Sequence, residues 1–111
     1  MGKVNMHAAV FSSCAQRDLE SLVIYIGEVL GSPQSARRIH DDLLEAVETL
    51  CQLPNLGKPF YDERLTRNDY RSFLVENYRI FYSFNETTVT IKRILHTRQD
   101  SDTYALISLP D

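Results

Sequence analysis

The chain has 111 residues, 43% of them apolar and 24% charged, and these proportions exclude a disordered chain. This length fits one domain spanning residues 1–111, and no apolar run approaches the roughly 20 residues needed to cross a bilayer. Only Cys14 and Cys51 are available, which excludes a disulfide scaffold, and we expect both to pack as small apolar side chains. The N-terminal segment 1–11 is too short and polar for a signal peptide, so a cytoplasmic location is expected.

The net charge of −3 is unevenly distributed along the chain. Residues 1–57 and 99–111 each carry −3, whereas residues 58–98 carry +3. A positive segment is a candidate anion-binding surface, but this excess is small for a nucleic-acid binder. An ordinary solvated surface is an equally good interpretation.

The first predicted elements are a strand and a helix. Residues 7–11 (HAAVF) predict a short strand, after which Ser12 or Ser13 offers a helix N-cap. Ser13 and Gln16 together form a capping-box pattern. Gly31 suits the position that ends the helix. The apolar stripe between these signals consists of Leu19, Leu22, Val23, Ile26, Val29 and Leu30.

A second helix is predicted to start at once, because Ser32 can cap it and Pro33 fits its first turn. The short connection favours an antiparallel helical hairpin. Segment 53–59 contains two prolines and a glycine and predicts a stop and a turn, and residues 60–68 predict a loop. The apolar stripe of the second helix comprises Ala36, Ile39, Leu43, Ala46, Val47, Leu50 and Cys51.

Three strands are predicted at 69–75, 78–84 and 88–96, because these segments are rich in β-branched and aromatic residues and are separated by short polar turns. We expect a short docked helix or turn in the tail, 98–111. The fold class is therefore α+β, of order β-α-α-β-β-β, with a helical hairpin on one face of a mostly antiparallel sheet. The middle strand should alternate, with Tyr78, Ile80, Tyr82 and Phe84 on one face and Arg79, Phe81 and Ser83 on the other.

No spacing of histidines and cysteines resembles a metal site, and no nucleophile elbow, P-loop or dinucleotide motif occurs. We therefore expect no metal and no cofactor. Arginines beside aromatic rings can hold phosphates and stack bases, although ordinary cross-strand packing is the favoured interpretation. The basic side chains in this setting are Arg71, Arg79, Lys92, Arg93, His96 and Arg98.

Several motifs resemble those of the RelE/ParE toxin superfamily. They are the run YRIFY at 78–82 and the strand end ILHTRQD at 94–100. Earlier pieces agree in order and spacing, namely AxxDL at 15–19 with Tyr25-Ile26, and LPxxGKP at 53–59. The ordered set covers nearly the whole chain and is nearer the ParE-like branch, which is associated with plasmid stabilisation.

The resemblance implies a toxin of a bacterial type II toxin–antitoxin module. Such a toxin is neutralised by a cognate antitoxin protein, with which it forms a hetero-oligomer, and it has no membrane partner. RelE-like members cleave messenger RNA in the ribosomal A site, whereas ParE-like members are not nucleases and poison DNA gyrase. Because both branches share a fold, the fold alone does not separate them.

The residues favour the ParE-like branch. The resemblance implies that a RelE-like site consists of two lysines on the second strand, two arginines and a tyrosine. In this chain Tyr70 and Ser72 stand at the two lysine positions. The two arginines and the tyrosine are matched by Arg79, Arg98 and Tyr104. Cleavage through the 2′-hydroxyl needs a base and cations around the phosphate. We therefore expect a non-enzymatic gyrase inhibitor. The alternatives are a ribosome-dependent mRNA endonuclease and a degenerate antitoxin-binding domain without toxicity.

Two further sets of residues are candidates for binding. Contacts to the target or to phosphate are predicted at Arg71, Lys92, Arg93 and His96, although a structural role at the strand end is favoured for His96. Strand addition at an open sheet edge is one way of binding the antitoxin. The other is a groove beside the first helix, at Leu19, Leu22, Val23 and Ile26.

Overall fold

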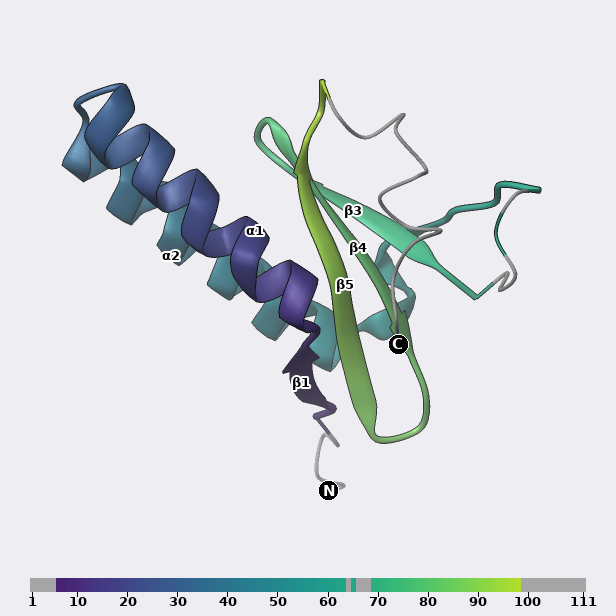
Figure 1. The fold of residues 1–111 in the computed structure, drawn as a ribbon. Coiled ribbons are helices and arrows are strands. Elements are labelled where there is room, and N and C mark those ends of the chain that lie inside the picture. Colours follow the sequence, from purple (N-terminus) through teal and green to yellow (C-terminus); the bar gives the residue numbers. More distant parts are fainter. Residues whose placement is uncertain (1–5, 64, 66–68, 99–111) are drawn as a thin grey trace.

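The computed structural model describes residues 6–63, 65 and 69–98. Its strands form a five-stranded sheet in the order β1-β5-β4-β3-β2, and the two long helices lie side by side against one face of it (Figure 1). The predicted α+β order is confirmed, with β2 as an addition. The elements are β1 (Ala8–Phe11), α1 (Ser13–Ile24), the π-helical segment η1 (Tyr25–Val29), α2 (Pro33–Gln52), the 3-10 turn η2 (Pro54–Leu56), β2 (Lys58–Pro59), β3 (Arg71–Val75), β4 (Tyr78–Phe84) and β5 (Thr88–His96).

Helix α1 starts directly after β1 because Ser12 caps it. The Ser12 hydroxyl accepts the Ala15 N–H at 3.0 Å and donates to the Lys92 carbonyl at 2.8 Å. The predicted capping box on Ser13 is wrong, since the Gln16 amide donates instead to the Phe11 carbonyl at 3.3 Å. Ser12 is buried, so one side chain joins the start of the helix to β5.

The end of the first helix departs from the expected α-helix. In η1 the Leu30 N–H bonds to the Tyr25 carbonyl at 2.9 Å, a five-residue spacing. Gly31 then adopts a left-handed conformation, with φ of 69°, and ends the helix as predicted. This end of the hairpin projects past the sheet (Figure 1), so Val29 and Leu30, expected on the buried stripe, are exposed.

Helix α2 confirms its predicted stripe completely. The Ser32 hydroxyl accepts the Ser35 N–H at 3.4 Å, and Pro33 occupies the first turn. Its buried residues are the seven predicted ones: Ala36, Ile39, Leu43, Ala46, Val47, Leu50 and Cys51.

The sheet carries an apolar layer on each face. The layer against the helices includes Ile80, Tyr82, Val89, Ile91 and Ile94. The opposite face, here the far face, carries Phe60, Leu65, Tyr70, Phe81 and Leu95. The predicted alternation along β4 is therefore confirmed, because Tyr82 packs toward the helices and its neighbour Phe81 toward the far face.

A bulge in β5 keeps this alternation in phase. The residues opposite Phe81 and Tyr82 are Arg93 and Ile91, which leaves Lys92 as an extra residue. Without the bulge, strict alternation along β5 would put Arg93 on the helix side of the sheet and Ile94 on the far face.

The turn after α2 is fixed by a close approach to the sheet. The Tyr82 hydroxyl donates to the Pro54 carbonyl at 2.6 Å and accepts the Gly57 N–H at 2.9 Å. A Cβ at Gly57 would lie 2.6 Å from the Tyr82 oxygen, so this position requires glycine. The contact brings β2 alongside β3, with Lys58 opposite Ser72, where only a turn was predicted.

Two expectations concern the ends and surface of the chain. The tail element predicted at 98–111 lies outside the described residues, and so does Tyr104. Arg98 is the one described residue of this segment, and it follows β5 in a turn. No helix within the described ranges is long and apolar enough to span a membrane.

Candidate functional site

Arg71 is engaged within the fold. It lies on β3 opposite Tyr82, and its Nη1 donates to the Gly57 carbonyl at 2.6 Å and to the Asn55 carbonyl at 3.2 Å. Its guanidinium also lies 6.0 Å from the centroid of the Phe84 ring. These contacts hold the turn after α2 against the sheet.

Arg93 and Lys92 lie where β5 meets α1. The Arg93 Nε and Nη2 donate to the Asp18 carboxylate at 2.6 and 2.8 Å, and the same carboxylate accepts the Ile94 N–H at 3.0 Å. This two-point geometry is strong and directional. Lys92 is buried at the bulge. Neither cation therefore lies on an open surface.

The far face is apolar around the two positions that the resemblance matches to lysines of a nuclease. Arg79 lies there on β4, opposite Leu95. Tyr70 and Ser72, which the resemblance matches to the two lysines, are only 5% and 7% exposed, and Tyr70 belongs to the apolar layer. Among the described residues, the centre of this face is therefore a packed layer.

Arg98 lies on the helix side of the sheet. Its backbone N–H donates to the His96 Nδ1 at 3.1 Å, and its side chain lines a hollow together with Tyr25 and Tyr78. Arg79 and Arg98 thus belong to different faces, and Tyr104 is not among the described residues. The geometry of the predicted trio stays a prediction.

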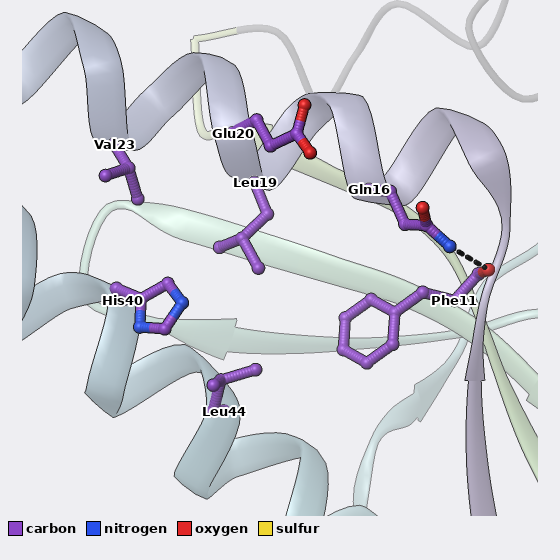
Figure 2. A pocket seen from close by; sticks show the side chains of 7 residues that line it. All are labelled: Phe11, Gln16, Leu19, Glu20, Val23, His40 and Leu44. Atoms are coloured by element: carbon purple, nitrogen blue, oxygen red, sulfur yellow. Dashed lines mark hydrogen bonds between the residues drawn. The ribbon is translucent and has the colours of Figure 1, made fainter.

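An apolar groove of about 570 Å³ lies between α1, α2 and β1 (Figure 2). Side chains of α1 and α2 face each other across it, and the Phe11 ring closes one end. Gln16 and Glu20 supply polar atoms from α1. The full lining is Phe11, Gln16, Leu19, Glu20, Val23, His40 and Leu44.

The predicted groove residues divide between the two sides of α1. Leu19 and Val23, four positions apart, line the apolar groove. Leu22 lies on the opposite side of α1, in a second hollow. Ile26 packs against the main core, which is the apolar layer between the sheet and the helices. Sequence reasoning missed Leu44 because helical spacing within one helix does not identify residues that a neighbouring helix contributes.

A second hollow, the edge cleft, has a volume of about 510 Å³ and lies between α1 and the later part of β5. Burial raises the pKa of the Tyr78 hydroxyl, and the neighbouring Tyr25 and Glu76 raise it further, so this group remains a hydrogen-bond donor at neutral pH. The edge cleft is lined by Asp18, Ser21, Leu22, Tyr25, Tyr78, Arg93, Ile94, Leu95, His96 and Arg98.

The cysteines have different surroundings. Cys51 packs in the main core as predicted, where burial, with a smaller effect of Glu48, raises the pKa of its thiol. Cys14 is half-buried in the first turn of α1. No group of three or more potential metal ligands occurs within the described part of the chain.

Comparison with known proteins identifies the same architecture. A family profile described as "ParE toxin of type II toxin-antitoxin system, parDE" matches residues 9–101. The chromosomal ParDE toxin–antitoxin system from P. aeruginosa is similar in structure, with a TM-score of 0.67 and 22% identity over 83% of this chain and 97% of that chain.

Two further solved structures are similar. The RelBE2 toxin–antitoxin complex from Mycobacterium tuberculosis has a TM-score of 0.62 and 26% identity over 86% of this chain and 97% of that chain. The RelB–RelE antitoxin–toxin complex from Methanococcus jannaschii has a TM-score of 0.52 and 19% identity over 86% and 98%. No curated protein matches the sequence significantly.

The family match extends from β1 through the hairpin and the meander, and so includes every element that forms the apolar groove and the edge cleft. The solved structures agree with it in fold. On this evidence the chain belongs to the ParE toxin family of type II toxin–antitoxin systems.

Proposed function

We propose that this toxin inhibits bacterial growth by binding DNA gyrase without catalysing a reaction, and that a cognate antitoxin neutralises it in the cytoplasm. The observation that carries the proposal is the ParE family match over residues 9–101. The far face supports it, because buried Tyr70 and Ser72 stand where an RNA-cleaving relative would place lysines. An apolar layer there does not stabilise the charge that develops on a phosphate during cleavage.

The antitoxin is proposed to dock in the apolar groove. Leu19, Val23 and Leu44 offer apolar surface to a side chain of the partner, and the groove is large enough to bury one. The similar solved structures are toxin–antitoxin complexes, which supports a protein partner of this kind and a hetero-oligomeric assembly.

An mRNA endonuclease is the second candidate function. The similarity to the RelBE2 complex, at 26% identity, favours it, and so does the presence of Arg79 in the middle strand. This function requires Arg79, Arg98 and Tyr104 to act on one phosphate. The third candidate is a domain that binds its antitoxin but has lost toxicity.

Induction of the chain without an antitoxin separates these functions, provided that transcript integrity and plasmid supercoiling are both followed soon after induction. Altered supercoiling with intact messages is expected, together with inhibition of purified gyrase by the purified chain. Transcripts cut within codons and unchanged supercoiling would instead identify a nuclease. Undisturbed growth at confirmed expression would leave the antitoxin-binding domain.

Matched variants assign the residues in the same experiment. We expect the triple variant Arg79→Ala, Arg98→Ala, Tyr104→Ala to cut no transcripts, just as the unsubstituted chain cuts none. A nuclease would lose its cleavage in this variant and keep it in Arg37→Ala, where the altered arginine is exposed on α2, away from both the groove and the edge cleft.

A further inference from the structure

The edge cleft exists because β5 is longer than its neighbour β1. The parallel pairing of these strands ends at Phe11 opposite Ile91, whereas β5 continues to His96. Figure 1 shows β1 beside only the first part of β5. Along the rest, the edge of the strand faces α1 across the edge cleft rather than another strand.

The chain itself shows how a carboxylate is held at this edge. Asp18 of α1 accepts the Ile94 N–H at 3.0 Å and receives two donors from Arg93, at 2.6 and 2.8 Å. A backbone N–H and a guanidinium together therefore bind one carboxylate in the first part of the cleft.

Further along β5, the cleft presents a second set of donors. Arg98 is exposed, and among the described residues no ion pair involves its guanidinium. Tyr25, 52% exposed, and half-buried Tyr78 line the same hollow, and each side chain carries a hydroxyl group. His96 accepts the Arg98 N–H through Nδ1, so the neutral ring carries its proton on Nε2.

The charges of the lining indicate which anion fits. Asp18 and Arg93 neutralise each other, which leaves Arg98 as the one surplus charge among the described residues of the lining when His96 is neutral. One cation with two hydroxyl donors matches a monoanionic carboxylate better than a phosphate dianion, which attracts additional cations.

From this arrangement we propose that the edge cleft binds an aspartate or glutamate side chain from an extended, acidic segment of the protein partner, which lies along the edge of β5. The carboxylate accepts hydrogen bonds from the Arg98 guanidinium and from the hydroxyls of Tyr25 and Tyr78. The inference rests on the proposed function in taking the partner to be a protein, and it specifies the chemistry by which that partner is recognised.

Capped peptides added to the purified full-length chain test this directly. The probes are acetyl-Val-Thr-Asp-Val-Thr-amide and the same peptide with asparagine in place of aspartate. Calorimetry measures their affinity, and amide NMR shifts of the protein locate where they bind. We expect the aspartate peptide to bind at least tenfold tighter and to shift the amides of residues 93–98. Arg98→Gln should weaken it about tenfold and Tyr25→Phe about threefold, because hydrogen bonds to charged groups are the stronger ones. Arg37→Gln, with the same charge change elsewhere on the surface, should leave affinity unchanged.

Equal binding of the two peptides, or unchanged affinity in a folded Arg98→Gln variant, would overturn the inference. Tighter binding of inorganic phosphate or 5′-AMP than of the aspartate peptide would also overturn it and reassign the cleft to phosphate. The peptide assay measures no toxicity, so a failure here leaves the proposed function to the growth and supercoiling experiments.

Discussion

The two sides of helix α1 form hollows of similar size, about 570 and 510 Å³, with different chemistry. On the groove side, Leu19 and Val23 face Leu44 and His40 of α2 and Phe11 of β1, and the proposed partner would gain affinity mainly from the apolar area it buries. On the cleft side, Asp18 and Tyr25 face the charged edge of β5, where direction and charge select the ligand. As proposed above, one side of the helix therefore contributes mainly the strength of partner binding, and the other side contributes its direction and charge selectivity.

The carboxylate on the cleft side also supports the fold, whereas the carboxylate on the groove side is exposed. Asp18 and Arg93, whose side chains are 14% and 18% exposed, join α1 to a strand 75 residues later in the chain. Glu20, two residues after Asp18, is exposed beside the apolar groove. The same residue class on one helix therefore has different energetic weight on its two sides.

The largest effect is expected for Asp18→Ala. Its removal breaks three charge-assisted hydrogen bonds and leaves Arg93 and the Ile94 N–H without the carboxylate, which costs about 2–3 kcal/mol of unfolding free energy. Urea denaturation measures this loss. Glu20→Ala is the matched control and should change stability by less than about 0.5 kcal/mol. Equal losses in both variants would contradict the assignment of the structural role to the cleft side.

A smaller effect is expected for Leu44→Glu, which places a charge in the apolar groove. Binding of the cognate antitoxin should weaken about thirtyfold, roughly 2 kcal/mol, because burying an unpaired carboxylate at the interface is unfavourable. Leu44 and Leu74 are both exposed, at 38% and 50%, so Leu74→Glu on β3 is the control with unchanged affinity. Calorimetry of the purified pair measures both variants, and identical affinities would exclude the groove as the docking site.

The smallest effect concerns Tyr78 in the edge cleft. Its pKa is raised above the usual value of about 10, so the folded state holds this proton more tightly than the unfolded chain does. The resulting stabilisation is complete below about pH 10 and is lost as the pH rises through the folded pKa. Tyr78→Phe should therefore lose less stability between about pH 9 and about pH 11 than the unsubstituted chain, as measured by urea denaturation. Tyr61→Phe, which alters an exposed tyrosine, should follow the unsubstituted chain.

Local patterns accounted for most of the fold. The α2 stripe was predictable residue by residue because seven positions at helical spacing pack on one layer. The N-cap was predicted only to within one residue, since Ser12 and Ser13 carry the same cap chemistry. The cap is Ser12, because its hydroxyl also donates to the Lys92 carbonyl of β5. This is a tertiary contact, which the local sequence does not reveal.

Some of the residues that line the two hollows could be singled out from the sequence. Leu19 and Val23 do line a groove, and His96 and Arg98 do line a cleft. Arg71 and Arg93 were singled out for charge, and both are engaged by carbonyls or a carboxylate of the fold. A charge visible in the sequence does not reveal its partner when that partner is many residues away.

The sequence by itself determined the order of the two long helices and of the strands other than β2, the two helical stripes up to Ile26 and Cys51, and the alternation of β4, because these follow from caps, periodicity and turn residues within short windows. The tertiary structure alone decided the bulge at Lys92, the pairing of β2, the burial of Arg93 against Asp18, and the separation of Arg79 and Arg98 onto different sides of the sheet. Each of these depends on segments distant in the chain satisfying one another's hydrogen bonds and charges, a constraint that arises only when the whole sheet is assembled.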